Sequence, residues 1–387
     1  MKIVAAQKNS LAAEIAAKTP KTRDRYVDFL RAFSICAVVV GHYISTVAIM
    51  SKNGFLVYNA AGMIPGMWAA TWLLQVMPLF FFVGGFSNFV SINSCRRRSE
   101  PDGKFIRVRV IRLLKPTVVF LGLWVVAAAV AVLISGAGTG LIRNFRMVIA
   151  PVWFLVVFMM VIVLTPVMER LHRCCRLWVV VALVLLMIAA DIMRFWSPWP
   201  YTGWANVAFV WLFVHQLGFF YADGSLVRAP RWLHATLALG GLLGLIILTN
   251  IGIYHRSMVG TGFESTSNMN PPTVPIAVLG CWFIGIAMLL RSSISRWLAR
   301  LKPWLIVVRA NSVIMTVYLW HLTAFGLVFY ALFLLGWART PPGTLVWWLE
   351  RPVWIIVPGM LLAVFVKIFA RFEIMAKAKS PLSKEES

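Results

Sequence analysis

The chain has 387 residues, of which 60% are apolar and 13% are charged, and its 37 Lys and Arg against 13 Asp and Glu give a formal net charge of +24. The charged share is about half that of an average soluble domain, and a soluble protein of this size cannot hide so much apolar surface. These values exclude soluble globular, collagen-like and disordered chains. They predict an all-α integral membrane protein.

Apolar stretches divide the chain into ten expected membrane-spanning helices, because each span needs about 20 mostly apolar residues. We expect a basic cytoplasmic tail over residues 1–26, one transmembrane domain over residues 27–370 and a second cytoplasmic tail over residues 371–387. Prolines at four span entries are tolerated there: Pro116, Pro151, Pro303 and Pro352. The expected spans are 29–50, 68–92, 116–134, 147–167, 177–193, 204–222, 232–253, 273–290, 312–336 and 353–370.

The cations are distributed unevenly between the two sides that these spans define. Thirty of the 37 Lys and Arg residues fall on the side of the termini and seven on the other side. Cytoplasmic loops carry an excess of Lys and Arg, so both termini are predicted to be cytoplasmic, in a multi-pass protein of the inner (plasma) membrane. The positive charge is thus explained by topology, and no nucleic-acid partner is expected.

Three histidines fall inside expected spans, near the membrane midplane: His42, His215 and His321. Titratable groups at that depth are costly, which makes each of them a functional candidate. One alternative is that each histidine only hydrogen-bonds a neighbouring helix. Another is a trihistidine metal site. We expect no metal site, because no two of these histidines share a helix at i, i+4 spacing and no acidic residue lies at their depth.

Basic residues occupy regular positions in and after the first span. His42 follows Arg31 by 11 residues, or about three helical turns, so both lie on one face, with a rise of roughly 16 Å between them. Asp28 and Arg31 are i, i+3 and can pair. In the loop expected after the second span, Arg109 and Arg112 are also i, i+3. Such an arginine pair is suited to phosphate, although ordinary cytoplasmic charge explains most cations of this loop.

Two further segments combine polar and small residues. The second span contains Gln75 and the pair Gly84-Gly85, which favours close helix packing. The outer loop from Glu264 to Thr273 is rich in hydroxyl and amide side chains and includes Asn270. This loop is either a solvated connection or an external substrate-binding segment.

These features together resemble the acyltransferase-3 family of integral membrane O-acyltransferases. The resemblance rests on motifs in order along the chain: Arg31 and His42 at the family's Arg-x10-His spacing, Pro78 to Gly85, Arg109 with Arg112, Trp153-Phe154-Leu155, and Ser312 with Tyr318-Leu-Trp-His321. Many members carry His two positions before this Trp, where this chain has Pro151. Some members carry an extracellular hydrolase-like domain, which we do not expect here. Asn270-Pro-Pro-Thr273 is similar to actinobacterial members and favours a cell-envelope sugar acceptor.

The resemblance implies transfer of an acyl group from a cytoplasmic donor, acyl-CoA, to a hydroxyl of a cell-envelope sugar or glycolipid. We expect His42 to be the general base, with an acyl-histidine intermediate as an alternative. No bound cofactor is expected, and the partners are acyl-CoA, the acceptor and the bilayer. The rival function is a transporter or flippase of a lipid-linked sugar, which favours inverted repeats and interrupted helices that we do not find in the sequence. Residues expected to bind substrate are Arg31, Arg109, Arg112, His321, His215, Trp153, Gln75, Glu264 and Asn270.

Overall fold

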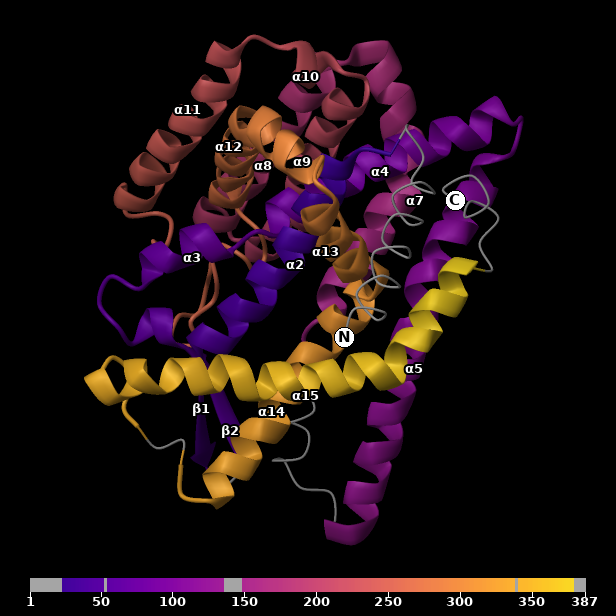
Figure 1. Cartoon of the computed structure of the whole chain (residues 1–387). Coiled ribbons are helices and arrows are strands. Elements are labelled where there is room, and N and C mark those ends of the chain that lie inside the picture. Colours follow the sequence, from indigo (N-terminus) through magenta and orange to yellow (C-terminus); the bar gives the residue numbers. More distant parts are fainter. Residues whose placement is uncertain (1–22, 52–53, 136–147, 338–339, 379–387) are drawn as a thin grey trace.

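A computed structural model describes residues 23–51, 54–135, 148–337 and 340–378. Within these ranges, ten helical segments are long and apolar enough to cross a membrane (Figure 1). The prediction of a ten-span, all-α membrane protein is therefore confirmed. Most of the tail expected over residues 1–26 lies outside the described residues, as does the end of the second tail from residue 379 onward.

Helices joined by loops make up the described chain, together with one β-hairpin. Strands β1 (Thr46–Ser51) and β2 (Gly54–Asn59) pair in antiparallel register, with Thr46 opposite Asn59. Two short 3-10 helices are η1 (Ala60–Gly62) and η2 (Pro200–Ala205). The α-helices are α2 (Arg25–Ser45), α3 (Trp68–Leu74), α4 (Met77–Arg97), α5 (Asp102–Ser135), α7 (Val152–Cys175), α8 (Leu177–Trp196), α9 (Asn206–Ala222), α10 (Ser225–Arg228), α11 (Arg231–Asn250), α12 (Val274–Leu298), α13 (Leu301–Ser312), α14 (Ile314–Leu334) and α15 (Leu345–Ala378).

The first helix, α2, is shorter than the span predicted from hydropathy. It begins after Asp24, whose carboxylate accepts the backbone N–H groups of Tyr26 and Val27 at 2.9 and 3.2 Å, as a helix N-cap does. It ends at Ser45, where extended backbone starts the β-branched strand β1. His42 therefore lies in the last turn of the helix, and its expected position near the middle of a span over residues 29–50 was wrong.

Helix α5 is longer than predicted, because its first half is cationic and hydropathy does not register it. The helix starts at Asp102, which follows Pro101 and places a favourable carboxylate in the first turn. Most of the expected loop is therefore helical and carries Arg107, Arg109 and Arg112. Two of the four prolines expected at helix entries lie inside helices: Pro116 in α5 and Pro352 in α15.

One span of the described chain is interrupted, contrary to the expectation from the sequence. The second breaks at Gln75 and Val76, between α3 and α4, and α4 then restarts with Pro78 in its first turn. The ninth is continuous over α14, Ile314–Leu334, and the turn at Val313 separates it from the short helix α13. Proline is favourable in a first helical turn, which explains the restart at Met77. The absence of interrupted helices is thus no longer an argument against a transporter.

Helices α4 and α9 cross with their backbones in close contact. Gly85 faces the backbone of His215 and Gly218, and Gly218 in turn faces the backbone of Phe82, so neither position has room for a Cβ atom. Next to this crossing, the rings of Phe81 and Trp211 stack with centroids 4.3 Å apart. The close packing expected for the Gly84-Gly85 pair is confirmed, and it fixes the distance between two central helices.

We expect Gly85→Ala to lower the stability of the protein by about 1–3 kcal/mol, because an added methyl group pushes α4 and α9 apart. The measurement is thermal unfolding of the purified protein in detergent. Gly122→Ala is the matched control, since it adds the same methyl group to a helix position with no neighbouring atom within 4 Å. Equal unfolding temperatures for the two variants would contradict the close crossing.

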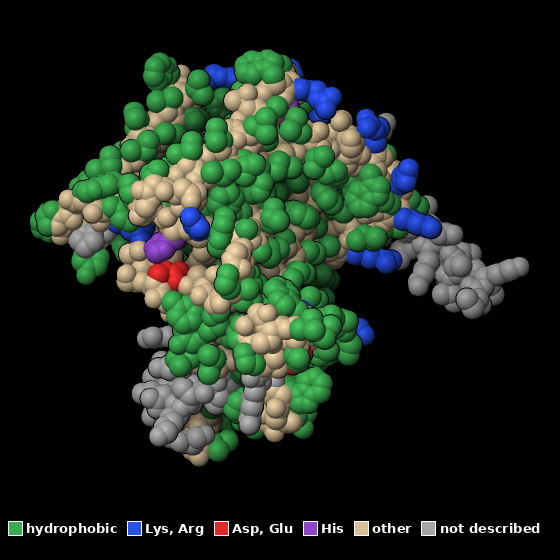
Figure 2. Space-filling model, turned by 90° about the vertical axis from the view of Figure 1, so that its left-hand side faces the viewer, with side chains coloured by type: hydrophobic (Ala, Val, Ile, Leu, Met, Phe, Trp, Pro, Cys, Tyr) green, Lys and Arg blue, Asp and Glu red, His purple; other side chains and the backbone are tan. Residues whose placement is uncertain are grey.

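Charges gather at one end of the bundle. Figure 2 shows most Lys and Arg side chains of the face it draws along the upper and right-hand edges, above a largely apolar surface. At the corner between α4, α5 and α7, the guanidinium of Arg96 bonds both carboxylate oxygens of Asp102, at 2.9 and 3.0 Å, and also Glu169. We call the end that carries this network the arginine-rich end. The hairpin lies at the opposite end (Figure 1).

The last helix, α15, crosses the front of α14 at a steep angle (Figure 1). Near its end, the buried carboxylate of Glu373 accepts the backbone N–H groups of Met315 and Thr316, at 3.3 and 3.0 Å, and the Thr316 hydroxyl at 2.9 Å. Helix N-termini leave such N–H groups unpaired, and a negative charge there is favourable. Glu373 thus caps α14 from a distant part of the chain.

Candidate active site

Two histidines predicted as functional candidates form a pair between α2 and α14. The Nδ1 atom of His42 lies 2.8 Å from Nε2 of His321, and the two rings are nearly parallel, at 8°. His321 is completely buried, whereas His42 is partly exposed. The arrangement joins the last turn of α2 to the second turn of α14.

The hydrogen bonds of His321 decide which nitrogen of each ring carries a proton. Nδ1 of His321 lies 2.6 Å from the carbonyl oxygen of Tyr318, which can only accept, so this nitrogen donates. With both rings neutral, Nε2 of His321 must then accept from Nδ1–H of His42. The Nε2 atom of His42 is left with its lone pair, and no described residue donates to it. His42 is thus prepared to accept a proton at Nε2.

Two tyrosines hold the histidine pair in place. The Tyr43 hydroxyl donates to the backbone carbonyl of His321 at 3.1 Å, which ties α2 to α14 beside the pair. The Tyr318 hydroxyl donates to the carbonyl of Pro151 at 2.9 Å and ties α14 to the start of α7. These two hydrogen bonds fix α2 against α14 and α14 against α7, and neither of them involves an imidazole ring.

In a second cluster, two arginines predicted from the sequence, one on α2 and one on α5, bond to the same part of α4. Arg31 donates to the Ser87 hydroxyl at 2.6 Å and pairs with Asp28 at 3.3 Å, as its i, i+3 spacing predicted. Arg109 donates to the Ser87 carbonyl at 2.6 Å and also bonds the Ser91 hydroxyl. Two guanidinium groups thus meet at one serine. They lie toward the arginine-rich end, about 16 Å from His42 along α2.

Arg112, which was predicted to act with Arg109, lies one turn further along α5 and is partly exposed. The structure places Arg31, rather than Arg112, beside Arg109 at Ser87. Both serines lie on the same face of α4, at i and i+4, and neither was singled out from the sequence. Polar residues repeated every turn in an apolar helix were the available signal.

His215 lies apart from the histidine pair. It is completely buried between α4 and α9, and its Nε2 atom lies 3.1 Å from the side-chain nitrogen of Asn88. Within the described part of the chain, no three His, Cys, Asp or Glu side chains are grouped to hold a metal ion, so the trihistidine arrangement is not formed. Trp153, at the start of α7, is 41% exposed and lies 6.2 Å from the ring of Trp211, which puts it at the periphery.

The remaining predicted substrate-binding residues lie in the loop between α11 and α12 or contact it. The side chain of Gln75, at the break between α3 and α4, donates to the sulfur of Met269 at 3.0 Å. Asn270 is exposed. Glu264 folds back onto its own loop and accepts the backbone N–H of Thr261 at 2.6 Å and the Thr261 hydroxyl. Burial raises the pKa of Glu264, but these hydrogen bonds outweigh it and hold the pKa below its usual value.

That loop also packs on the hairpin. The backbone N–H of Asn59 donates to the carbonyl of Thr261 at 2.9 Å, and the ring of Tyr58 stacks on Phe263 with centroids 4.6 Å apart. Glu264 therefore stabilises a connection between the loop and the hairpin. It is not brought to the histidine pair by any contact within the described residues.

In the described part of the chain, ten apolar helices, a histidine pair and two arginines that bond the same serine of α4 define a multi-pass membrane protein with a candidate site for proton transfer. Comparison with protein families identifies its class: the acyltransferase-3 model, described as an acyltransferase domain, matches residues 24–371. The chain belongs to this family, and it is a membrane acyltransferase. No curated protein and no solved structure matches it.

Proposed function

We propose that the protein transfers an acyl group from acyl-CoA to a hydroxyl of a cell-envelope sugar or glycolipid, with His42 as general base. The observation that carries the proposal is the hydrogen-bond chain from His42 through His321 to the Tyr318 carbonyl, which leaves His42 Nε2 free to accept a proton. We place the protein in the plasma membrane, with the arginine-rich end in the cytoplasm, because Lys and Arg are enriched on that side.

The reaction follows from this proton position. Nε2 of His42 takes the proton of the acceptor hydroxyl while the hydroxyl oxygen attacks the thioester carbonyl carbon. The carbon–sulfur bond breaks, and the proton on His42 passes to the CoA thiolate. During this step Nδ1–H of His42 keeps its bond to His321, so the imidazolium forms without any change in the pair. The products are the acyl ester and CoA.

The two arginines at Ser87 are suited to bind the phosphate end of CoA, which lies far from its thioester. Guanidinium groups bind phosphate through charge-assisted hydrogen bonds. CoA carries its phosphates at one end and its thioester at the far end of an extended arm. Because Arg31 and His42 share one face of α2, the phosphates are held at Ser87 while the arm follows the helix to the histidine pair.

The function is tested with the purified protein in nanodiscs, labelled acyl-CoA and the glycolipid fraction of the host envelope. We expect label to move from CoA to glycolipid. A rival function is transport of a lipid-linked sugar, which buried histidines also suit. If labelled glycolipid crossed the membrane of proteoliposomes and the thioester stayed intact, the proposed acyl transfer would be wrong and transport would be the function.

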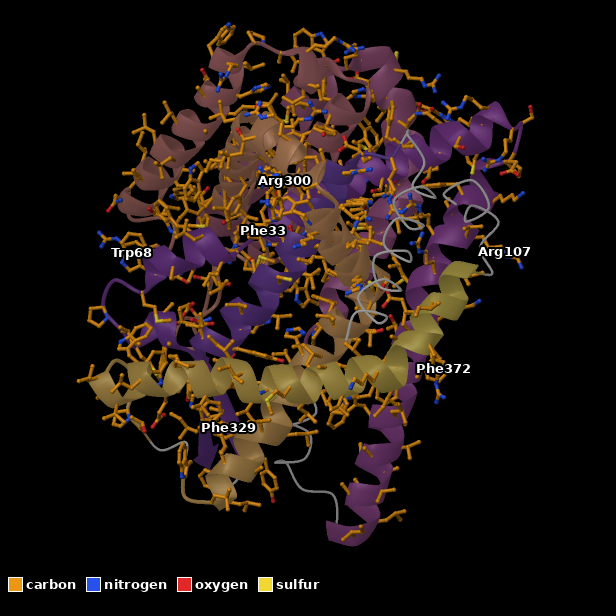
Figure 3. All side chains as sticks on the ribbon, viewed as in Figure 1. Phe33, Trp68, Arg107, Arg300, Phe329 and Phe372 are labelled. Atoms are coloured by element: carbon orange, nitrogen blue, oxygen red, sulfur yellow. The ribbon has the colours of Figure 1, made fainter. Side chains whose placement is uncertain are left out.

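The double variant Arg31→Gln with Arg109→Gln is expected to weaken CoA binding by about 10–100-fold, because a hydrogen bond to a charged group contributes about 1.5–3 kcal/mol. The measurement is isothermal titration with CoA. Arg107→Gln removes one positive charge from an exposed position on α5 (Figure 3) and is the control. If the double variant and the control both bind CoA like the wild type, the arginines at Ser87 do not bind CoA and act only in membrane topology and helix packing.

A further inference from the structure

A cavity of about 460 Å³ lies between α14, α15 and strand β1. Figure 3 labels one of its lining residues, Phe329, on α14 beside the hairpin. Its wall combines five aromatic rings with a few polar side chains, and its volume falls in the range of small-molecule binding sites. No residue of this cavity was predicted to bind substrate from the sequence.

The cavity lies about one helical turn beyond the histidine pair. Thr46 follows His42 by four residues and Phe325 follows His321 by four, and both line the cavity. On α14, four residues rise about 6 Å and return to the same face, and the backbone N–H of Thr46 donates to the carbonyl of His42. The ring of Phe325 stacks on Tyr43 with centroids 5.8 Å apart, so it forms the floor next to the pair. The cavity therefore lies on the side of the pair opposite to the arginines at Ser87.

Aromatic rings and a buried arginine form the back wall of the cavity. Phe325, Phe329 and Phe333 repeat every fourth position on α14 and form one aromatic face. The guanidinium of Arg351 lies 4.0 Å from the ring of Trp347 and donates to its backbone carbonyl at 3.1 Å. Cation–π contact and hydrogen bonding leave this arginine buried and engaged with the wall.

Glu350 supplies the one carboxylate among the described lining residues. Its Oε1 atom accepts the Thr340 hydroxyl at 2.6 Å, and within the described chain no donor is placed on Oε2. A carboxylate oxygen accepts hydrogen bonds from hydroxyl groups, and flat aromatic faces pack against the C–H faces of ring compounds. This combination recognises a ring that carries hydroxyls on its edge and C–H groups on its faces.

We propose that this cavity binds the acceptor, and that the bound group is a sugar ring. The proposal rests on the proposed function. The C–H face of the ring packs on Phe329 and Phe333, and its hydroxyls donate to Glu350. The hydroxyl nearest the floor is then presented to His42. Donor and acceptor thus reach the histidine pair from opposite ends of the bundle.

Two variants in nanodiscs test the assignment. Glu350→Gln keeps the size of the side chain and removes its charge, and Ala48→Trp fills the cavity from β1. Val346→Trp introduces the same side chain at an exposed position on α15 and is the control for Ala48→Trp. Three quantities are measured: CoA affinity, the KM for the host glycolipid fraction, and the preference among acyl-CoA chain lengths.

We expect Glu350→Gln to raise the glycolipid KM by about 10–100-fold, with unchanged CoA affinity and chain-length preference. Ala48→Trp should abolish transfer and Val346→Trp should not. An unchanged KM in Glu350→Gln would overturn the assignment. So would an Ala48→Trp protein that still transfers short acyl groups but not long ones, because the cavity would then hold the acyl chain. A wild-type protein that neither binds CoA nor transfers label contradicts the proposed function itself, which is a separate result.

Discussion

The variant His42→Gln is expected to lose acyl transfer by about 10²–10⁴-fold, the usual contribution of a positioned general base. The amide of Gln can replace the hydrogen bond to His321, but it cannot take a proton at neutral pH. Folding and CoA binding should therefore remain as in the wild type. The measurements are transfer from labelled acyl-CoA, CoA affinity and the unfolding temperature.

His234→Gln is the matched control for this experiment. His234 is also buried, and its Nε2 atom lies 2.8 Å from the carbonyl of Leu226, a bond that a Gln side chain can also donate. We expect this variant to transfer normally. Near-normal transfer by His42→Gln would show that His42 is structural. A label retained on His42 after incubation with acyl-CoA alone would favour the acyl-histidine alternative over the general base.

The largest effect outside His42 is expected at His321, and it should depend on the replacement. His321→Leu cannot accept from Nδ1–H of His42, so the proton of His42 is free to move to Nε2 and block the base. We expect a loss of transfer of about 10²-fold, at the lower end of the range for removal of a base. His321→Gln keeps an acceptor oxygen and should lose much less.

The comparison between these two variants distinguishes positioning from packing. A histidine that only fills space would be replaced better by Leu than by Gln in this buried place, and the order of activities would reverse. CoA affinity should stay constant in both proteins, because the arginines at Ser87 are bound to other helices. A fall in CoA affinity that accompanies the fall in transfer would indicate a general disturbance of the bundle.

Local patterns predicted the ten spans, since each depends on the composition of its own segment. They also predicted that Asp28 pairs with Arg31 and that Arg31 and His42 lie on one face of α2, because both follow from helix geometry. The pairing of His42 with His321 did not follow, because the two residues are 279 positions apart and only the packing of α2 on α14 brings them together. The sequence predicted His321 as a substrate-binding residue and named no partner for His42, whereas that partner is His321 itself.

The ends of the helices were also predicted poorly from the sequence. Hydropathy extended the first span to residue 50, although β-branched residues from Thr46 onward form a strand. It also began the third span at Pro116, although the helix starts at Asp102. Both errors misplaced functional side chains: His42 moved from the middle of a span to the end of a helix, and Arg109 moved from a loop onto a helix that faces Ser87.

The cap that Glu373 places on α14 also makes the site depend on the order in which the chain is synthesised. Glu373 lies near the end of the described chain, yet it receives the first backbone N–H groups of the helix that carries His321. Until the ribosome has released these last residues, that end of α14 has no carboxylate to hold it, and the wall formed by α15 is missing. The helix that carries His321 therefore receives its carboxylate cap only after the last turns of α15 have been made.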